Sequence, residues 1–243
     1  MSVNERIDLT LEDGRILKLA GLDPPRPTPL DPYLDIMTRD KVADWLTGRE
    51  IWFRQVEGRR DRWGRVTVEA FARAGAPGSP IMPVRRAVLE AGLARYEADS
   101  ARPCGAQMLA AEASARAGRL GLWADPYYAV LKPTDRGAFT ERAGTSVIVE
   151  GEVSGVDVGR YRSTLFFGPR RSRDFAVTVA QRAIKLFESA GLDLAALKGQ
   201  KIRVRGLLDL RFGPQVEISN PDEVEVIKTV QGDGASDPSV ERR

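Results

Sequence analysis

Five arginines between positions 160 and 173 form the densest cluster of residues that could do chemistry. They are Arg160, Arg162, Arg170, Arg171 and Arg173. Guanidinium groups donate paired hydrogen bonds to phosphate oxygens, and aromatic rings stack on unpaired bases. Tyr161, Phe166 and Phe167 lie in the same stretch. The combination predicts a site for single-stranded nucleic acid, with a solvated basic turn as the alternative interpretation.

A strand through this stretch would separate its side chains onto two faces, because successive residues alternate. One face would carry Arg160, Arg162, Thr164 and Phe166, and the other would carry Tyr161, Leu165 and Phe167. Arginines without an aromatic pair on the same face are a weak form of the single-strand signature. Both interpretations of the cluster therefore stay open.

Several other chemistries are excluded by residues that the sequence lacks. It contains no histidine, which excludes Ser-His-Asp and Cys-His catalysis and histidine-ligated zinc. Its single cysteine, Cys104, excludes an internal disulfide and a cysteine-rich metal site, and we expect it to be a small residue in a loop or at a helix start. No cofactor is expected, except Ca²⁺ if the protein is an active nuclease.

The sequence also gives expectations about the compartment. No run approaches the roughly 18 apolar residues that a membrane-spanning helix needs. The first four residues lack the charged start and apolar core of a secretory signal. We therefore expect no membrane partner and a cytoplasmic chain as it stands, or a secreted or periplasmic protein if the true N-terminus lies upstream of Met1.

Length and charge set the scale of the protein. The 243 residues suit two domains of ordinary size, and the 42% hydrophobic and 29% charged residues are normal for a globular chain. The net charge is only +3, so any polyanion site must come from local clustering of Lys and Arg.

The first half of the sequence mixes strand and helix patterns. Alternating residues and turn signals predict strands at 7–11, 16–22, 50–56 and 66–71. Apolar residues at helical spacing predict helices at 34–46, 84–95 and 107–120. Five prolines between positions 23 and 32 predict a loop, because proline lacks the backbone donor that helices and central strands need.

Four motifs in this half follow one another in a fixed order. They are Arg62-Trp63-Gly64-Arg65, Ala87-Val88-Leu89-Glu90-Ala91-Gly92-Leu93-Ala94, Glu112-Ala113-Ser114-Ala115 and Leu122-Trp123. The series resembles the staphylococcal nuclease (thermonuclease) family. The resemblance implies a five-stranded OB-fold β-barrel with three helices over residues 1–124, and one more strand before position 7. If that strand is missing, the barrel has an open edge.

The resemblance also implies a catalytic site. In that family two Asp hold a Ca²⁺ ion, one Glu is the general base and two Arg stabilise charge on the phosphorus. The first Asp falls nearest to Glu5, in a poor alignment, and the first Arg falls on Lys18. The second Asp falls on Asp23, the Glu on Arg26 and the second Arg on Arg65. Arginine cannot accept a proton, so the resemblance implies a degenerate site.

These residues also have structural interpretations. Asp23 can cap a turn instead of binding metal, and Arg65 can form a salt bridge with Asp61 or Glu69 instead of contacting phosphate. If the proline-rich loop turns inward, Lys18, Arg26 and Arg65 would face one pocket beside Asp23. Such a pocket would attract phosphate without a metal.

The second half of the sequence predicts another β domain. After a linker at 125–143, strand patterns occur at 145–153, 161–167 and 174–179, a helix at 181–190, and strands at 201–206, 215–218 and 224–227. This order is typical of an OB-fold barrel over residues 144–228. It also resembles the C-terminal OB-type domain of some bacterial thermonuclease-family proteins. Residues 229–243 are rich in Gly, Ser, Asp and Pro and predict a disordered tail.

The fold expected is therefore mainly β with α, as two OB-fold barrels. The function expected is a thermonuclease-family protein with a degenerate active site that binds nucleic acid or a protein partner. One alternative is an active Ca²⁺-dependent nuclease on DNA or RNA, in which Asp31 or Asp35 replaces the base. The other is a purely protein-binding scaffold that uses an open barrel edge.

Overall fold

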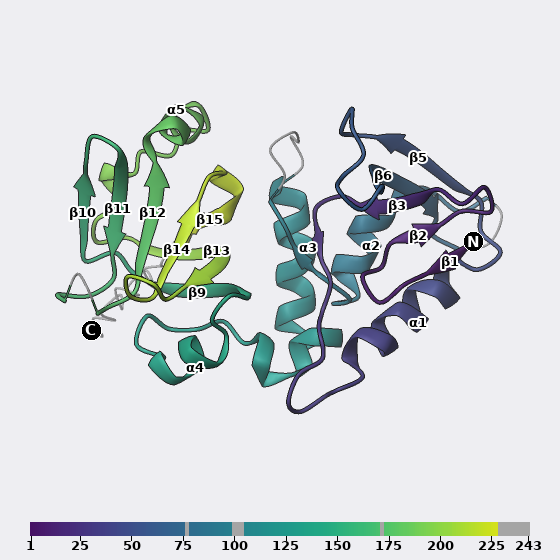
Figure 1. The fold of residues 1–243 in the computed structure, drawn as a ribbon, viewed down its shortest axis with the longest axis horizontal. Coiled ribbons are helices and arrows are strands. Elements are labelled where there is room, and N and C mark those ends of the chain that lie inside the picture. Colours follow the sequence, from purple (N-terminus) through teal and green to yellow (C-terminus); the bar gives the residue numbers. More distant parts are fainter. Residues whose placement is uncertain (76–77, 99–104, 171–172, 228–243) are drawn as a thin grey trace, which may run out of the picture. The chain divides into compact units, whose positions relative to one another are not determined.

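The computed structural model describes residues 1–75, 78–98, 105–170 and 173–227 (Figure 1). Cys104, Arg171 and the predicted tail lie outside the described residues. The chain divides into two compact units, unit 1 (Met1–Val130) and unit 2 (Leu131–Arg243). Over the two units together the described strands hold more residues than the helices, so the expectation of a mainly β fold with α is confirmed at that level.

Unit 1 is built on a sheet with the strand order β1-β2-β3-β6-β5. The strands are β1 (Ser2–Val3), β2 (Leu9–Thr10), β3 (Ile16–Leu19), β5 (Ile51–Gln55) and β6 (Val66–Arg73), and β7 (Ile81–Pro83) also pairs with β6. Strand β3 is parallel to β6, and the other pairs are antiparallel. A separate antiparallel pair joins β4 (Leu22–Asp23) to β8 (Arg95–Tyr96).

The start of unit 1 differs from the sequence expectation in two ways. A strand does precede position 7, but β1 is only two residues long. The strand expected at 16–22 is divided into β3 and β4, because the chain turns at Ala20-Gly21 and the second part pairs with β8 instead of β6. Local alternation cannot reveal such a change of partner.

Three α-helices accompany this sheet: α1 (Leu34–Leu46), α2 (Val84–Glu90) and α3 (Gly105–Ala117). Their apolar residues meet the inner face of the strands in one core, which includes Leu17, Val68, Val42 and Val88. After α3 the chain forms two short 3₁₀ helices, η1 (Gly121–Ala124) and η2 (Pro126–Tyr128).

Two glycines allow the end of α2 to touch η1. Gly92 and Gly121 both have positive φ angles, of 67° and 54°. The backbone N–H of Leu122 donates to the Gly92 carbonyl at 2.9 Å. A methyl group added at Gly92 would overlap the Leu120 carbonyl, and one added at Gly121 would overlap the Gly92 carbonyl. The contact between α2 and η1 therefore depends on both glycines.

Unit 2 has the strand order β10-β11-β12-β14-β13-β15, with β9 also paired to β13. Its elements are α4 (Arg136–Glu141), β9 (Ser146–Glu152), β10 (Gly155–Val158), β11 (Arg162–Phe166), β12 (Ala176–Ala180), α5 (Gln181–Ser189), η3 (Ala195–Leu197), β13 (Lys201–Asp209), β14 (Gln215–Ile218), η4 (Pro221–Glu223) and β15 (Val224–Val226). Strand β12 is parallel to β14. Only Val153 and Ser154 separate β9 from β10, so the pairings of the two strands, to β13 and to β11, join into a closed circuit.

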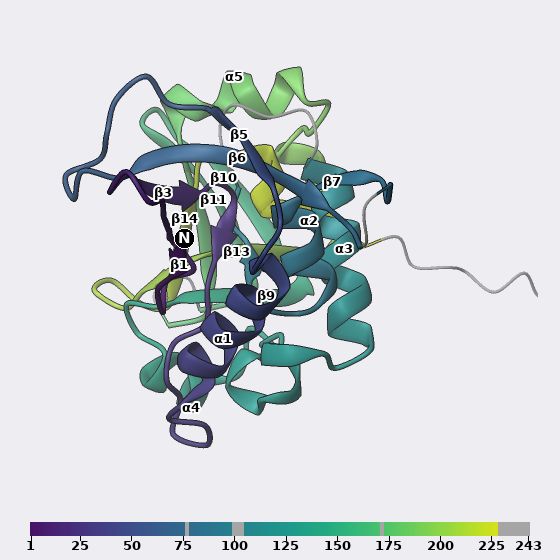
Figure 2. The ribbon, with the colours of Figure 1, turned by 90° about the vertical axis from the view of Figure 1, so that its right-hand side faces the viewer.

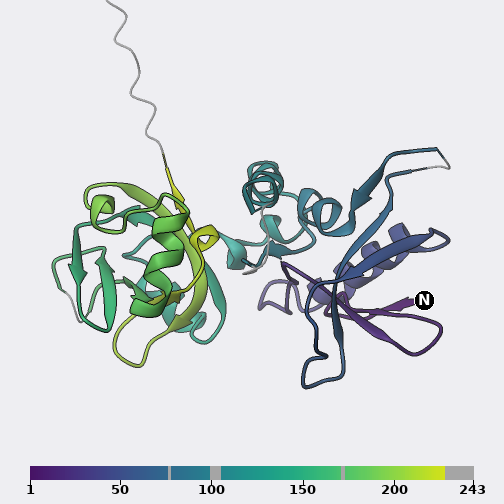
Figure 3. The same cartoon turned by 90° about the horizontal axis from the view of Figure 1, so that it is seen from above.

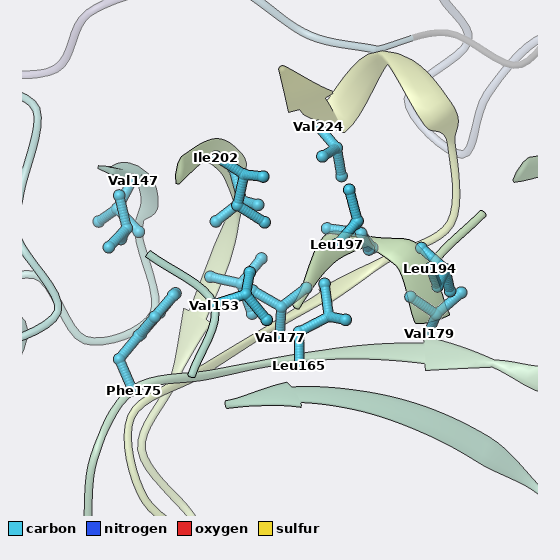
Figure 4. Close-up of a cluster of buried hydrophobic side chains, with 14 of the residues drawn as sticks. Val147, Val153, Leu165, Phe175, Val177, Val179, Leu194, Leu197, Ile202 and Val224 are labelled. Atoms are coloured by element: carbon cyan, nitrogen blue, oxygen red, sulfur yellow. The ribbon is translucent and has the colours of Figure 1, made fainter. Parts of the chain in front are cut away.

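The inside of this circuit is filled by aliphatic side chains and a few rings. Figure 4 shows side chains from β9, β11, β12, β13 and η3 converging, among them Val177, Leu165 and Ile202. Phe139 of α4 stacks on Phe175 with ring centroids 5.5 Å apart. The strands and helices of unit 2 thus share one core.

The segment expected as a linker at 125–143 contains folded structure. Asp125 caps η2 by accepting the N–H of Tyr127, and Tyr128 is buried in unit 1. Phe139 of α4 is buried in unit 2. None of the helices in the described ranges is long and apolar enough to cross a membrane.

We predict that Gly92→Ala destabilises unit 1 by about 3 kcal/mol or more, because it adds overlap to left-handed strain. All four tryptophans of the sequence lie within residues 1–130, so intrinsic fluorescence during urea unfolding measures unit 1. Gly48→Ala is the matched control, since Gly48 has a similar φ of 70° but no atom within 4 Å of an added methyl. It should cost only about 1–2 kcal/mol. Equal losses in the two variants would contradict the close contact.

Candidate functional site

Arg65 lies buried between two carboxylates in unit 1. Its side chain is 9% exposed, and its Nη1 is 3.0 Å from Asp8 Oδ2 while its Nε is 2.7 Å from Asp61 Oδ2. Burial would lower the pKa of Arg65, but the hydrogen bonds to Asp61 and Asp8 raise it above its ordinary value. Of the two salt-bridge partners suggested by the sequence, Asp61 is present and Glu69 is not.

Glu69 belongs to a different ion-pair group. Its Oε2 accepts a hydrogen bond from Arg54 at 2.6 Å, and its Oε1 forms an ion pair with Arg85 Nη2 at 3.1 Å. Arg85 projects from α2 and is 5% exposed. These ion pairs link α2 to β5 and β6. They share no residue with the Arg65 group, which consists of Arg65, Asp8 and Asp61.

Asp8 is the acidic residue that sequence reasoning missed. Glu5, the residue nearest to the first expected Asp, pairs with Arg39 at 2.6 Å instead. Asp8 is 3% exposed, and Asn4 Oδ1 accepts its backbone N–H at 2.9 Å. The signal that could have found Asp8 is its place between Ile7 and Leu9, as a lone charge in an apolar stretch. Continuing the β2–β3 register by one step places Asp8 opposite Lys18.

The other residues assigned by the resemblance are paired as well. Lys18 Nζ lies 3.9 Å from Glu97 Oε2. Asp23 Oδ2 accepts from Arg95 at 2.6 Å, and the Arg95 guanidinium lies 5.1 Å from the centroid of the Tyr128 ring. Each expected catalytic charge except that of Arg26 thus meets an opposite charge within unit 1.

Arg26 is held through its backbone, while its side chain is exposed. Its N–H donates to the Tyr128 hydroxyl at 2.8 Å, and that hydroxyl donates to the Arg26 carbonyl at 3.3 Å. Burial raises the pKa of Tyr128 above its ordinary value. The loop is therefore fixed at this point, yet Lys18, Arg26 and Arg65 are not presented together as three free cations.

The acidic residues do not fit a Ca²⁺ ion. Calcium takes six to eight oxygen ligands, usually with several carboxylates. Within the described ranges no three acidic or other ligating side chains gather as a metal site. Asp8 and Asp23 each bind a guanidinium group instead.

An exposed ring lies beside the Arg65 group. Trp63 is 56% exposed, and the guanidinium carbons of Arg62, Arg65 and Arg6 lie 4.0, 4.8 and 5.9 Å from its ring centroid. Cation–π attraction therefore helps to hold this turn of unit 1.

Unit 2 contains a groove of about 680 Å³ over β11, β12 and β14. Its lining comprises Asp157, Gly159, Arg160, Tyr161, Arg162, Thr164, Phe166, Asp174, Ala176, Thr178, Phe212, Gly213, Pro214 and Gln215. Two of the five arginines of the sequence cluster, Arg160 and Arg162, thus lie in the groove with three aromatic rings. The structure therefore brings guanidinium groups and aromatic rings together in one groove.

The position of Tyr161 corrects the alternation argument. Strand β11 begins at Arg162, so Tyr161 belongs to the preceding turn and does not follow strand alternation. It lines the same groove as Arg160 and Arg162 and is 78% exposed. The Arg160 guanidinium lies 5.6 Å from the centroid of its ring.

Phe212 is the second groove residue that the sequence did not reveal. It is 80% exposed and precedes the Gly213-Pro214 turn that leads into β14. A large apolar residue directly before a Gly-Pro turn was the available signal. Sequence spacing could not show that this turn lies near the one that carries Tyr161.

The remaining arginines of the cluster lie outside the groove lining. Arg170 and Arg173 are exposed in the turn after β11, and Arg171 lies outside the described residues. Asp174 organises this turn, because it accepts the N–H of Arg170 at 2.9 Å and pairs with Arg136 at 3.1 Å.

Comparisons with known proteins add no identification. No protein-family model matches the chain, and no curated protein matches it in a sequence search.

We predict that Asp8→Asn destabilises unit 1 by about 3 kcal/mol, because removing one partner of a buried pair leaves Arg65 incompletely neutralised. Asp13→Asn is the control in the same hairpin, since the Asp13–Arg15 pair is about half exposed on both sides. It should cost less than about 1 kcal/mol. Tryptophan fluorescence in urea measures both. A small loss for Asp8→Asn would show that this pair does not hold unit 1 together.

Proposed function

We propose that the protein binds single-stranded nucleic acid through the groove of unit 2 and does not hydrolyse it. One observation carries the proposal: Tyr161 and Phe212, each about four-fifths exposed, line the same groove as Arg160 and Arg162. Large aromatic side chains normally gain stability from burial, and exposed apolar patches mark binding sites. Rings for bases and guanidinium groups for phosphates are the combination that single-strand grooves use.

The strand order of unit 2 supports an OB-type barrel. If β9 and β10 are counted as one bent strand, the helix α5 follows the third strand, and the third and fifth strands, β12 and β14, are parallel. OB-type barrels bind oligonucleotides on the face formed around strands two and three. In unit 2 these are β11 and β12, which carry Arg162, Thr164, Phe166, Ala176 and Thr178 of the groove lining.

The polar groups of the groove favour unpaired bases. Thr164, Thr178 and Gln215 offer hydroxyl and amide groups that can donate to and accept from base edges. In a duplex the Watson–Crick edges are paired and the ring faces are stacked, whereas a single strand presents both. The negative charges of Asp157 and Asp174 in the lining balance the positive charges of the two arginines. Net positive charge alone therefore does not account for the binding proposed here.

The strand order of unit 1 supports its resemblance to the thermonuclease family. If β4, which pairs outside the main sheet, is left out of the count, the third and fifth strands, β3 and β6, are parallel, and α1 lies between the third and fourth strands as α5 does in unit 2. The absence of hydrolysis rests on the site residues. Arg26 stands where that family has its base, and Asp8 and Asp23 are bound by Arg65 and Arg95.

We predict two separable effects on binding of a fluorescent oligothymidine, followed by anisotropy over a range of salt concentrations. Arg160→Glu with Arg162→Glu should flatten the dependence of log affinity on log salt by about 0.7 for each lost phosphate contact. Tyr161→Ala and Phe212→Ala should each weaken binding by about 1–3 kcal/mol through lost stacking. The aromatic variants should leave the salt slope unchanged.

Two controls make this test specific. Arg182→Glu reverses an exposed charge on α5, outside the groove lining, and should change neither slope nor stacking. A neutral oligosaccharide should not compete with the oligonucleotide. Competition by the sugar, or equal weakening by Arg182→Glu, would reject the groove as a nucleic-acid site.

We also predict that Ca²⁺ does not produce hydrolysis. The full chain should release no acid-soluble nucleotides from single-stranded DNA above a chelator control, because no base stands at position 26 and the carboxylates are paired. Arg26→Glu restores a carboxylate there and should remain inactive, since Asp8 and Asp23 stay bound to guanidinium groups. Chelator-sensitive hydrolysis by the wild type would establish an active nuclease. Such hydrolysis by Arg26→Glu alone would show that the rest of the catalytic site is intact.

A further inference from the structure

The outer edge of β5 in unit 1 has no neighbouring strand among the described residues. Strand β5 pairs with β6 on one side, over Ile51–Gln55 (Figures 1 and 2). The other side of β6 is used by β3 and β7. An unpaired strand edge presents backbone donors and acceptors that can pair with another chain.

The hydrogen-bond pattern identifies which groups face outward. The N–H of Val56 donates to the Thr67 carbonyl at 3.0 Å. Backbone groups alternate in direction along a strand, so the N–H and carbonyl groups of Arg54 and Trp52 also point toward β6. Val68 of β6 lies opposite Gln55, and its carbonyl accepts the N–H of Ala20 on the side of β6 away from β5. Val68 and Gln55 therefore do not exchange hydrogen bonds with each other, as the alternation requires. The backbone groups of Ile51, Phe53 and Gln55 therefore point away from β6.

Unit 2 shows how such an edge is satisfied in this chain. There β13 is antiparallel to β14, and its other edge pairs with β9 through seven register positions, from Lys201↔Glu152 to Leu207↔Ser146. Strand β5 is the counterpart of β13, because each follows a helix in the chain. Strand β5 is antiparallel to β6, which is parallel to β3, just as β13 is antiparallel to β14, which is parallel to β12. The place that β9 takes in unit 2 is not taken by a described strand in unit 1.

A hollow of about 690 Å³ lies at the start of this edge. It is bounded by Met1 and the β2–β3 turn on one side, and by the end of α1 and Ile51 on the other (Figure 3 shows unit 1 from above). Leu46 and Leu11 give it an apolar floor. Glu12 at its rim is exposed and has no ion-pair partner within the described ranges. Arg49, also at the rim, is occupied by the carbonyls of Arg73 and Gly75.

The sequence of β5 does not protect its edge. Natural edge strands commonly carry Lys, Pro or a bulge that prevents pairing with another chain. Strand β5 reads Ile-Trp-Phe-Arg-Gln, with three residues that favour strands, and its one charge, Arg54, pairs with Glu69. Arg15 lies 5.4 Å over the Phe53 ring from the β2–β3 turn, and its half-exposed side chain can move aside.

We propose that the free edge of β5 binds an extended segment of a protein partner by strand addition. The segment has apolar residues at alternate positions, which fill the hollow toward Leu11 and Leu46, and a basic residue that meets Glu12. Main-chain hydrogen bonds to Ile51, Phe53 and Gln55 provide affinity, and the hollow provides specificity. This interaction surface goes beyond the single-strand binding proposed for unit 2 and does not depend on it.

Display of random nonapeptides against the full chain, followed by anisotropy with the enriched synthetic peptides, tests the proposal. Enriched peptides should alternate apolar residues. Gln55→Pro removes one outward N–H and adds a ring at the edge, so it should weaken binding by about tenfold. Gln55→Ala keeps the N–H and should bind within about twofold of wild type. No enrichment, or equal binding by the two variants, would overturn the proposal.

Residue-resolved hydrogen exchange of the wild-type chain gives a test that no variant's stability can affect. Bound peptide should slow exchange at the amides of Ile51, Phe53 and Gln55 and leave Trp52 and Arg54, already bonded to β6, unchanged. Protection without this alternation would refute strand addition. The same alternation appearing without peptide, as protein concentration rises, would instead identify a second copy as the occupant and overturn the assignment to a separate partner.

Discussion

Both edges of a strand carry backbone groups that need hydrogen-bond partners, and this constraint organises each unit. The parallel pairs β3–β6 and β12–β14 force the chain to cross over between neighbours, since parallel strands cannot be joined by a tight turn. The helices α1 and α5 lie in these crossovers and cover apolar side chains. In unit 2 the circuit then closes through β9, whereas in unit 1 the described pairings end at β5.

Buried charges form the second layer of organisation in unit 1. Arg65 joins the turn at Asp61 to Asp8 at the start of β2, and Arg85 joins α2 to Glu69 on β6. A buried ion pair adds little net stability, but a broken one leaves an unpaired charge and costs much more. These pairs therefore specify which elements meet. Asp8 is thereby bound to a guanidinium group, as Asp23 is bound to Arg95, which links the stability of unit 1 to the chemistry it is proposed to lack.

Local patterns predicted the elements that local rules control. The apolar stripe predicted a helix at 34–46, and α1 spans Leu34–Leu46. The alternation at 215–218 predicted β14 with the same bounds. The division of β3 from β4 could not be predicted, because the partner of β4 is β8, over seventy positions away. Asp8 and Phe212 were missed for the same reason: their importance comes from Arg65 and Tyr161, which are distant in sequence.

The two proposed interaction surfaces share one physical property. In each, groups that would gain stability from burial or hydrogen bonding are left without it among the described residues. Tyr161 and Phe212 stay in water although burial of a ring would stabilise unit 2. Ile51, Phe53 and Gln55 keep unpaired backbone groups although the equivalent edge of β13 is paired. Consistency between local preference and fold is the rule in stable domains, so departures from it concentrate where a protein meets its ligands. On this basis we propose the rings of unit 2 and the edge of unit 1 as two independent sites, one for bases and phosphates and one for a polypeptide backbone.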